Sequence, residues 1–453
     1  ILAQALAALG RALGAGRGAM SNGGGTPRCS GCKVLCCGTK PARLVDSRHP
    51  DESDYLPVPK SVEEFGELDS GGSPTSMSMP RSRRLPQERT VGMEIEGFLG
   101  IMFQWLNLLL IFVPLGIVSH FSKWSSAAIF CCNFAAIVPL AGILGAATES
   151  LAVHTGQMVG GLLNATFGNA VEMIVTIQAI NKGLISVVQG SLLGSILSNL
   201  LLVLGMAFFA GGLTRKEQKF SAAGAGATMM CLVLGSIALA LPTIYNCVPG
   251  TSEHDVLEIS RVSSVIIAIV YILFLIFQLG THAHLFSAGD EEEDEEAPLS
   301  IVSSLALLFG CTLCVSYCSE FLVDSIEDVS EEYGLPKAFI GVILLPIVGN
   351  AAEHVTAVTV AMRGKMDLTI GVAVGSSTQI VLFVIPFAVI VGWVCDQPMT
   401  LDFRVFDASV LILSCFIAVI VLQDGSSNWL EGCMLMATYL LVAVISWYVP
   451  DGE

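Results

Sequence analysis

Apolar runs of about twenty residues recur along the chain from Gly97 onward. A run of that length spans about 30 Å of hydrocarbon as a helix, and a helix satisfies its backbone hydrogen bonds internally. Charged residues make up 13% of the chain, against about 25% in soluble domains. The sequence therefore predicts an all-α membrane protein with about eleven transmembrane helices. The predicted spans cover residues 98–119, 124–147, 157–180, 184–210, 222–244, 259–280, 299–322, 336–361, 367–393, 406–422 and 429–449.

Two hydrophilic segments divide the chain. Residues 1–89 are rich in Gly, Ser and Pro, so they cannot bury enough apolar surface to fold and are expected to form a disordered hydrophilic tail. Residues 286–298 hold seven consecutive acids, at 290–296, which cannot enter lipid and predict an acidic loop. This loop is either a self-repelling linker or a surface that collects cations or regulates the protein. The first transmembrane helix is predicted within 90–122.

The sequence on the two sides of the acidic loop repeats. The motif GNAVE at 168–172 recurs as GNAAE at 349–353, and the same offset of 181 positions maps GSLLGS at 190–195 onto GVAVGS at 371–376. We therefore predict a first repeat at 123–285 and a second at 299–453. Each repeat contains five predicted spans, and an odd number makes the second repeat enter the membrane from the opposite face. This is the inverted-repeat plan of secondary transporters.

Charge is distributed unevenly between the tail and the membrane part. Twelve of the 22 Lys and Arg residues precede position 90, whereas 30 of the 39 acids follow it, which suits cations and argues against a nucleic-acid partner. Short loops on the two sides of the membrane carry equal numbers of basic residues. Four arginines at 81–89 directly precede the first span and favour a cytosolic N-terminus, which also places the acidic loop in the cytosol.

Each repeat centres on a predicted span that glycine interrupts, at Gly168 in one and Gly349 in the other. Such breaks free backbone carbonyls at membrane depth, which is tolerated beside a cavity or an ion. A glutamate follows each break, Glu172 and Glu353, and a carboxylate at the bilayer centre costs roughly 2.5–3.5 kcal/mol, so both are candidate functional residues. The alternative is that they share a proton and only join two helices. Duplication of the whole motif favours the functional role.

Amide oxygens accompany both carboxylates. Asn169 lies three residues before Glu172, and Asn350 lies three before Glu353, so each pair shares a helical face. Two such halves, completed by water and backbone carbonyls, could supply the six to eight oxygen ligands that Ca2+ prefers. Further neutral oxygens could come from the next span of each half, where Ser and Thr also serve simply to pack helices. These residues are Ser195, Ser198, Ser376 and Gln379.

Two more acids lie near span ends, Glu149 after the second span and Glu320 in the seventh. Their corresponding places in the two halves predict an outer pair of ligands or proton carriers, with simple interfacial residues as the alternative. His354 directly follows Glu353 and points to a different helical face, so it is expected to donate a hydrogen bond rather than bind an ion.

The motifs GNAVE with GSLLGSILSN, and LLPIVGNAAEH with GVAVGSSTQI, resemble the cation/proton exchanger family, the vacuolar Ca2+/H+ antiporters. The resemblance covers about residues 90–450 and includes the acidic loop. It implies eleven spans, Ca2+ as the transported substrate and Glu172 and Glu353 as its ligands. The family's polar positions around them would be Asn169, Asn350, Ser376 and Gln379.

The resemblance implies a secondary transporter and not an enzyme, in the membrane of an acidic organelle such as the vacuole. Its partners would be Ca2+ and H+, with Mn2+ or other divalent cations as alternatives, and the lipid bilayer; no cofactor is expected. A Na+-driven Ca2+ exchanger and a Ca2+-sensing membrane scaffold remain alternative functions. No G-x-G-D motif, and no rhomboid-like serine with a suitably placed base, supports a third alternative, an intramembrane protease. The sequence does not predict the oligomeric state.

Overall fold

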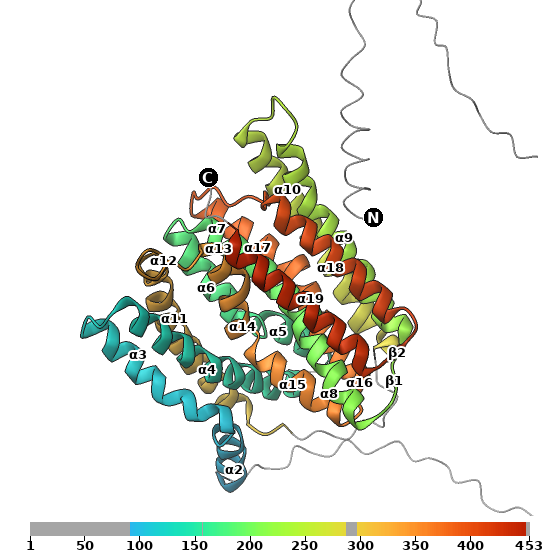
Figure 1. Cartoon of the computed structure of the whole chain (residues 1–453). Coiled ribbons are helices and arrows are strands. Elements are labelled where there is room, and N and C mark those ends of the chain that lie inside the picture. Colours follow the sequence, from blue (N-terminus) through green and yellow to red (C-terminus); the bar gives the residue numbers. More distant parts are fainter. Residues whose placement is uncertain (1–90, 156, 287–296, 450–453) are drawn as a thin grey trace, which may run out of the picture. The chain divides into compact units, whose positions relative to one another are not determined.

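The computed structural model describes residues 91–155, 157–286 and 297–449, which form one helical domain (Figure 1). The predicted tail at 1–89 and the acids at 290–296 lie outside the described residues. Up to the acidic segment the elements are α2 (Val91–Met102), η2 (Trp105–Ile111), α3 (Phe112–Phe121), α4 (Ser126–Thr155), α5 (Gln157–Phe167), α6 (Ala170–Asn181), α7 (Ile185–Leu197), η3 (Ser198–Val203), α8 (Leu204–Thr214), β1 (Gln218–Lys219), α9 (Ala222–Asn246), α10 (Glu253–Ile276), η4 (Phe277–Thr281) and η5 (Ala283–Leu285).

After the acidic segment the chain is again almost entirely helical. The elements are α11 (Ile301–Asp324), α12 (Ile326–Tyr333), α13 (Lys337–Phe339), η6 (Ile340–Leu344), α14 (Leu345–Gly349), α15 (Ala351–Met362), α16 (Met366–Gln379), η7 (Ile380–Val384), α17 (Ile385–Val394), α18 (Val405–Leu422), β2 (Ser426–Ser427) and α19 (Trp429–Tyr448). Elements η2 and η5 are 3-10 helices, and η3, η4, η6 and η7 are π-helical. The all-α prediction is confirmed except for the two short strands.

The count of eleven transmembrane helices is not confirmed. Within the described residues, eight helices are long and apolar enough to cross a membrane, or ten if each of two bent helix pairs forms one span. The bends measure 81° at residues 103–104 and 56° at Asn350. The span predicted at 157–180 is interrupted around Gly168, as expected, and consists of two short helices, α5 and α6.

Corresponding helices begin at the same offset in the two halves of the domain. Helices α6 and α15 begin at 170 and 351, α7 and α16 at 185 and 366, and α8 and α17 at 204 and 385, each pair 181 residues apart. A π-helical turn follows α7 in one half and α16 in the other, at η3 and η7. Such turns interrupt regular helix and are frequent at functional sites. The repeated sequence is therefore also a repeated local structure.

The two ends of the domain are built differently. At one end, which we call the ladder face, β1 pairs antiparallel with β2, and the loops at 215–221, 363–365 and 423–428 lie there. Arg215 donates a hydrogen bond to the carbonyl of Arg363 at this end (3.4 Å). The opposite end, which we call the strap face, carries the irregular segment 395–404, the strap.

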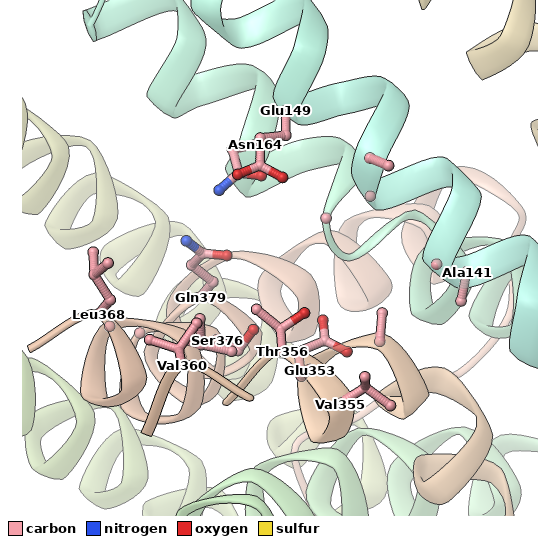
Figure 2. A pocket seen from close by; sticks show the side chains of 18 of the residues that line it. Ala141, Glu149, Asn164, Glu353, Val355, Thr356, Val360, Leu368, Ser376 and Gln379 are labelled. Atoms are coloured by element: carbon pink, nitrogen blue, oxygen red, sulfur yellow. The ribbon is translucent and has the colours of Figure 1, made fainter. Parts of the chain in front are cut away.

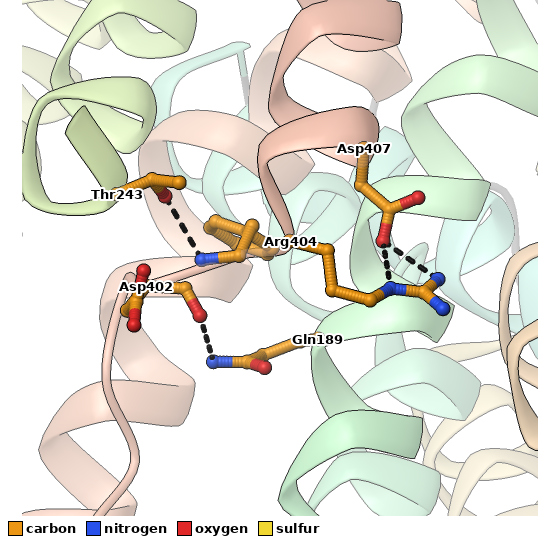
Figure 3. A network of polar contacts seen from close by, with 6 residues as sticks. Gln189, Thr243, Asp402, Arg404 and Asp407 are labelled. Atoms are coloured by element: carbon orange, nitrogen blue, oxygen red, sulfur yellow. Dashed lines mark hydrogen bonds and ion pairs between the residues drawn. The ribbon is translucent and has the colours of Figure 1, made fainter. Parts of the chain in front are cut away.

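The strap is held by hydrogen bonds from two neighbouring helices (Figure 3). The side chain of Gln189 in α7 donates to the carbonyl of Asp402 (3.1 Å), and the backbone N–H of Phe403 donates to the hydroxyl of Thr243 in α9 (2.9 Å). Phe403 is buried together with Leu401 and Met399. The strap thus closes the spaces between helix ends on this face.

Ion pairs also gather on the strap face. Lys182 pairs with Asp324 (2.8 Å), Arg261 with Glu258 (2.8 Å), Lys337 with Glu327 (3.2 Å) and Arg404 with Asp407 (2.7 Å). The Lys182–Asp324 pair joins the end of α6 to the end of α11. Hydrogen bonding to Asp324 raises the pKa of Lys182, so the lysine stays charged throughout the physiological range.

Candidate functional site

Glu172 and Glu353 lie at equivalent helix starts inside the domain. Helix α5 ends at Phe167, and α6 begins at Ala170 with Glu172 in its first turn. Helix α15 likewise begins directly after the break at Asn350, with Glu353 in its first turn. The peptide dipoles at a helix start favour nearby negative charge. Each break therefore places a carboxylate where the backbone supports it electrostatically.

The two glutamates belong to different halves, and the carboxylate of Glu172 lies beside Gly349, at the helix break that precedes Glu353. Glu172 is 5% exposed, and a methyl group built on Gly349 would lie 2.8 Å from its Oε1 atom. One carboxylate oxygen of each glutamate, Oε2, is buried without a hydrogen-bond partner among the described residues. Buried carboxylate oxygens need a hydrogen bond, a proton or a cation. The pair can therefore bind a divalent cation or two protons.

Amide groups of the repeat motifs link the two halves next to these carboxylates. The Nδ2 group of Asn169 donates to Oε1 of Gln379 (2.9 Å), and Nδ2 of Asn350 donates to the carbonyl of Ser195 (3.2 Å). Both asparagines are nearly fully buried. Their NH2 groups are engaged in this way, so any contact with a cation would come from their Oδ1 atoms.

A cavity of about 630 Å³ leads from the ladder face to Glu353. It passes Ser221 and Asp367 at the outer end, and its lining includes Gln379 further in. Figure 2 shows Glu149 and Asn164 together at one side of this cavity, with Ser376, Thr356 and Glu353 across from them. The cavity therefore gives an ion a polar route from one face to one glutamate.

Glu172 lies beyond the end of this cavity. It lines a second cavity of only about 10 Å³ with Ser191 and Ser195, closed by apolar side chains that include Leu322 and Leu345. Val171 and Gly349 border both cavities. The glutamate pair thus lies where the open route from the ladder face ends, with only this small cavity beyond it.

Beyond the glutamate pair, helices pack closely at glycines of the first half. Gly190 in α7 meets Gly341 in η6, where an added methyl group would lie 3.5 Å from the Gly341 Cα atom. A methyl group on Gly194 would lie 2.6 Å from the Pro346 side chain and would also overlap the Val342 carbonyl. A methyl group on Gly190 would make ordinary van der Waals contact, whereas at Gly194 only glycine allows α7 and the broken helix of the second half to approach this closely.

The equivalent glycines of the second half are not packed. A methyl group on Gly371 or Gly375 in α16 would meet nothing within 4 Å, and both residues line the large cavity. The same pair of glycines is therefore covered in one half and open in the other. The structure is open at the ladder face and closed at the strap face.

The other residues singled out in the sequence are distributed between the faces. Glu149 lines the large cavity, whereas Glu320 lies at the strap face near Lys182, so these two acids do not meet. Ser198 is fully buried in η3. As expected, His354 donates a hydrogen bond, from Nδ1 to the carbonyl of Asn350 (2.5 Å).

Three features of the structure were not predicted from the sequence. Asn164 lines the cavity, and the only signal for it was its place one helical turn before Gly168. Thr356 lines it one turn after Ala352. The Lys182–Asp324 pair joins residues 142 positions apart, and no local pattern predicts such a contact.

Comparison with known proteins places these features in a family. The family model described as "Sodium/calcium exchanger protein" matches residues 125–280 and 303–448. The vacuolar calcium ion transporter of Schizosaccharomyces pombe is 44% identical over 78% of this chain and 86% of its own length. Vacuolar cation/proton exchanger 3 of Oryza sativa is 47% identical over 75% of this chain and 84% of its own.

A solved structure has the same fold. The structure of native YfkE superposes with a TM-score of 0.67 and 35% identity, covering 76% of this chain and all of that one. The family match covers both halves of the helical domain and includes both glutamate motifs. The chain therefore belongs to the sodium/calcium exchanger protein family, and its relatives within that family include the cation/proton exchangers that its motifs resemble.

Proposed function

We propose that this protein is a Ca2+/H+ antiporter, a secondary active transporter that moves cytosolic Ca2+ into an acidic organelle by alternating access. One observation carries the proposal: Glu353 lines the large cavity that opens at the ladder face, whereas Glu172 is buried beyond it beside a cavity of only about 10 Å³. A bound ion is then accessible from one face of the membrane at a time. Relatives named vacuolar calcium ion transporter and vacuolar cation/proton exchanger support the substrates and the organelle.

Ca2+ and protons compete for the same two carboxylates in this mechanism. Ca2+ enters from the ladder face and is bound by Glu172 and Glu353, with Asn169, Asn350, Ser376 and Gln379 supplying neutral oxygens. Ligand carboxylates must be deprotonated, so binding releases protons. After the site opens to the acidic side, protons neutralise the carboxylates and Ca2+ leaves. Glu149, which lines the large cavity, and Glu320, near Lys182 at the strap face, would carry protons or ions toward the two faces.

Energetics favour the use of both carboxylates. A ~100-fold proton gradient supplies about 2.7 kcal/mol per proton, whereas moving Ca2+ up a ~1000-fold gradient costs about 4 kcal/mol. One proton is too few without help from a membrane potential. Two protons, one for each glutamate, suffice.

Reversal of the packing at the repeated glycines would provide alternating access. In the state open to the strap face, α5 would pack on Gly371 and Gly375 as the broken helix of the second half now packs on Gly190 and Gly194. The 181-residue repeat makes the two closed arrangements equivalent. Exchange of one for the other moves the opening from one face to the other.

The four arginines at 81–89 directly precede the first helix and support a cytosolic N-terminus, which would place the ladder face in the cytosol.

The experiment that tests this function is uptake of radioactive calcium into proteoliposomes. An imposed pH gradient, acidic inside, should drive uptake, and a Na+ gradient of equal size at constant pH should not. Uptake driven by Na+ alone would instead establish a Na+-driven exchanger. Absence of uptake under both gradients, with Ca2+ still bound, would favour a Ca2+-sensing scaffold.

A further inference from the structure

The basic residues of the ladder face form a surface that the transport cycle does not use. Arg215, Lys216 and Lys219 lie on the loop between α8 and α9, and Arg363 and Lys365 lie between α15 and α16. All five side chains are exposed. We call these five residues the basic surface. Positive side chains repel an approaching cation, so transport of Ca2+ does not explain why these five residues lie together.

The two loops that form the basic surface are fixed in place. Arg215 donates to the carbonyl of Arg363, and its guanidinium lies against Gly364, which has a φ of +84°. Pairing of β1 with β2 fixes Lys219 opposite Ser426. The charges therefore belong to an ordered surface.

Glu217 in the first loop offsets one of the five positive charges, and the other nearby acids accept hydrogen bonds from backbone groups outside the basic surface. Asp367 accepts a hydrogen bond from the backbone N–H of Ser221 (2.7 Å), and Asp424 accepts one from that of Ser426 (3.1 Å). Glu431 accepts one from the backbone of Asn428 in a capping box. Those three carboxylates are thus engaged at loop and helix ends, and apart from the hydrogen bond from Arg215 to Arg363 the basic side chains donate to no other described residue.

Large apolar side chains stand directly beside the basic surface. Leu213 is 69% exposed at the end of α8, Met362 is 51% exposed at the end of α15, and Trp429 is 49% exposed at the start of α19. In a membrane protein such residues face the acyl chains, and tryptophan marks the headgroup level. The basic surface therefore lies at the depth of the lipid phosphates.

We propose that the basic surface binds the headgroup of an anionic phospholipid in the adjacent leaflet. Arg and Lys are the side chains that recognise phosphate, and Arg can do so with two hydrogen bonds. Juxtamembrane basic residues attract anionic lipids, and each contributes enough to change the affinity about fivefold. The bound lipid joins the loops that flank the cavity mouth, because Ser221 and Asp367 line that cavity.

Native mass spectrometry of the detergent-solubilised full chain tests the proposal. The chain is titrated with phosphatidylinositol 4-phosphate and with phosphatidylcholine of the same acyl chains. Wild type should bind the anionic lipid at least tenfold more tightly. Arg215→Gln with Arg363→Gln should weaken that binding at least tenfold and leave phosphatidylcholine binding unchanged. The matched control, Lys123→Gln with Arg261→Gln, removes two charges from the strap face and should bind as wild type does.

A second pair of substitutions and a deletion complete the test of lipid binding. Lys219→Gln with Lys365→Gln probes the basic surface without touching the Arg215 contact, so it serves if the arginine variant proves less stable in a thermal melt. Equal affinity of wild type for the two lipids, or unchanged affinity in both basic-surface variants, would overturn the proposal. Anionic-lipid binding that appears only after deletion of residues 290–296 would also overturn it, because the acidic segment would then be the occupant.

Discussion

Gly349 of the second half leaves room for the carboxylate of Glu172 of the first half, since a methyl group on residue 349 would lie 2.8 Å from Glu172 Oε1. Glycine at position 349 therefore has two roles. It allows the helix break, and it leaves space for the carboxylate of Glu172. The equivalent Gly168 meets its own helical turn, at the carbonyl of Asn164. The two copies of the motif therefore have unequal roles in this state.

The first prediction concerns that contact. Gly349→Ala should displace the Glu172 carboxylate and raise the Ca2+ concentration for half-maximal uptake about tenfold, since overpacking of this kind costs about 1–3 kcal/mol. Gly310→Ala is the matched control, because a methyl group there would meet nothing within 4 Å. Concentration-dependent uptake in proteoliposomes measures both. Equal values for Gly349→Ala and wild type would show that the carboxylate position does not matter.

The second prediction concerns the carboxylates themselves. Glu172→Gln and Glu353→Gln should each abolish proton-driven Ca2+ uptake while the protein stays folded and inserted, because an amide keeps the size but cannot exchange a proton. Glu258→Gln, on the strap face, should transport normally. The measurement is uptake per inserted molecule at equal protein density. Normal uptake by either inner variant would remove these residues from the mechanism.

The third prediction concerns closure of the large cavity. Gly375→Leu should be tolerated in the open state, where an added side chain finds space, but should prevent α5 from packing against α16 and so stop transport. A reporter cysteine at Asn164→Cys, labelled by an impermeant maleimide from the ladder face, should lose reactivity in cycling protein and keep it in the Gly375→Leu background. Gly310→Leu is the control. Loss of labelling in the blocked variant would contradict this closing movement.

Much of the fold and the inner site followed from the sequence, for identifiable physical reasons. Spanning helices follow from the length of apolar runs, and the duplicated motif located Glu172 and Glu353 because an intramembrane carboxylate is costly. The interruption expected at Gly168 is present and divides the span at 157–180 into α5 and α6, although hydropathy alone averages across it. Hydropathy also cannot reveal the 81° bend after Met102.

Other features depend on contacts between distant segments. The difference between Gly194, which is packed, and Gly375, which is open, has no trace in the sequence, since both occupy the same motif position. In the proposed mechanism that difference would belong to one state of the cycle and not to the fold as a whole. Asn164 and the Lys182–Asp324 pair likewise appear only when helices from the two halves are brought together.

The central claim is that Ca2+ and protons exclude each other at Glu172 and Glu353, and proton release tests it most directly. Ca2+ is added to the detergent-solubilised protein in weak buffer at constant starting pH, and a proton indicator reports the protons released. Reciprocal linkage requires release in wild type, together with a fall in apparent Ca2+ affinity as the pH is lowered. The coupled pair should titrate as one unit and not as two independent residues. We expect release from wild type and none from the Glu172→Gln, Glu353→Gln double variant. Absence of release from wild type, or undiminished release from the double variant, would contradict the account and turn attention to Glu149 and Glu320.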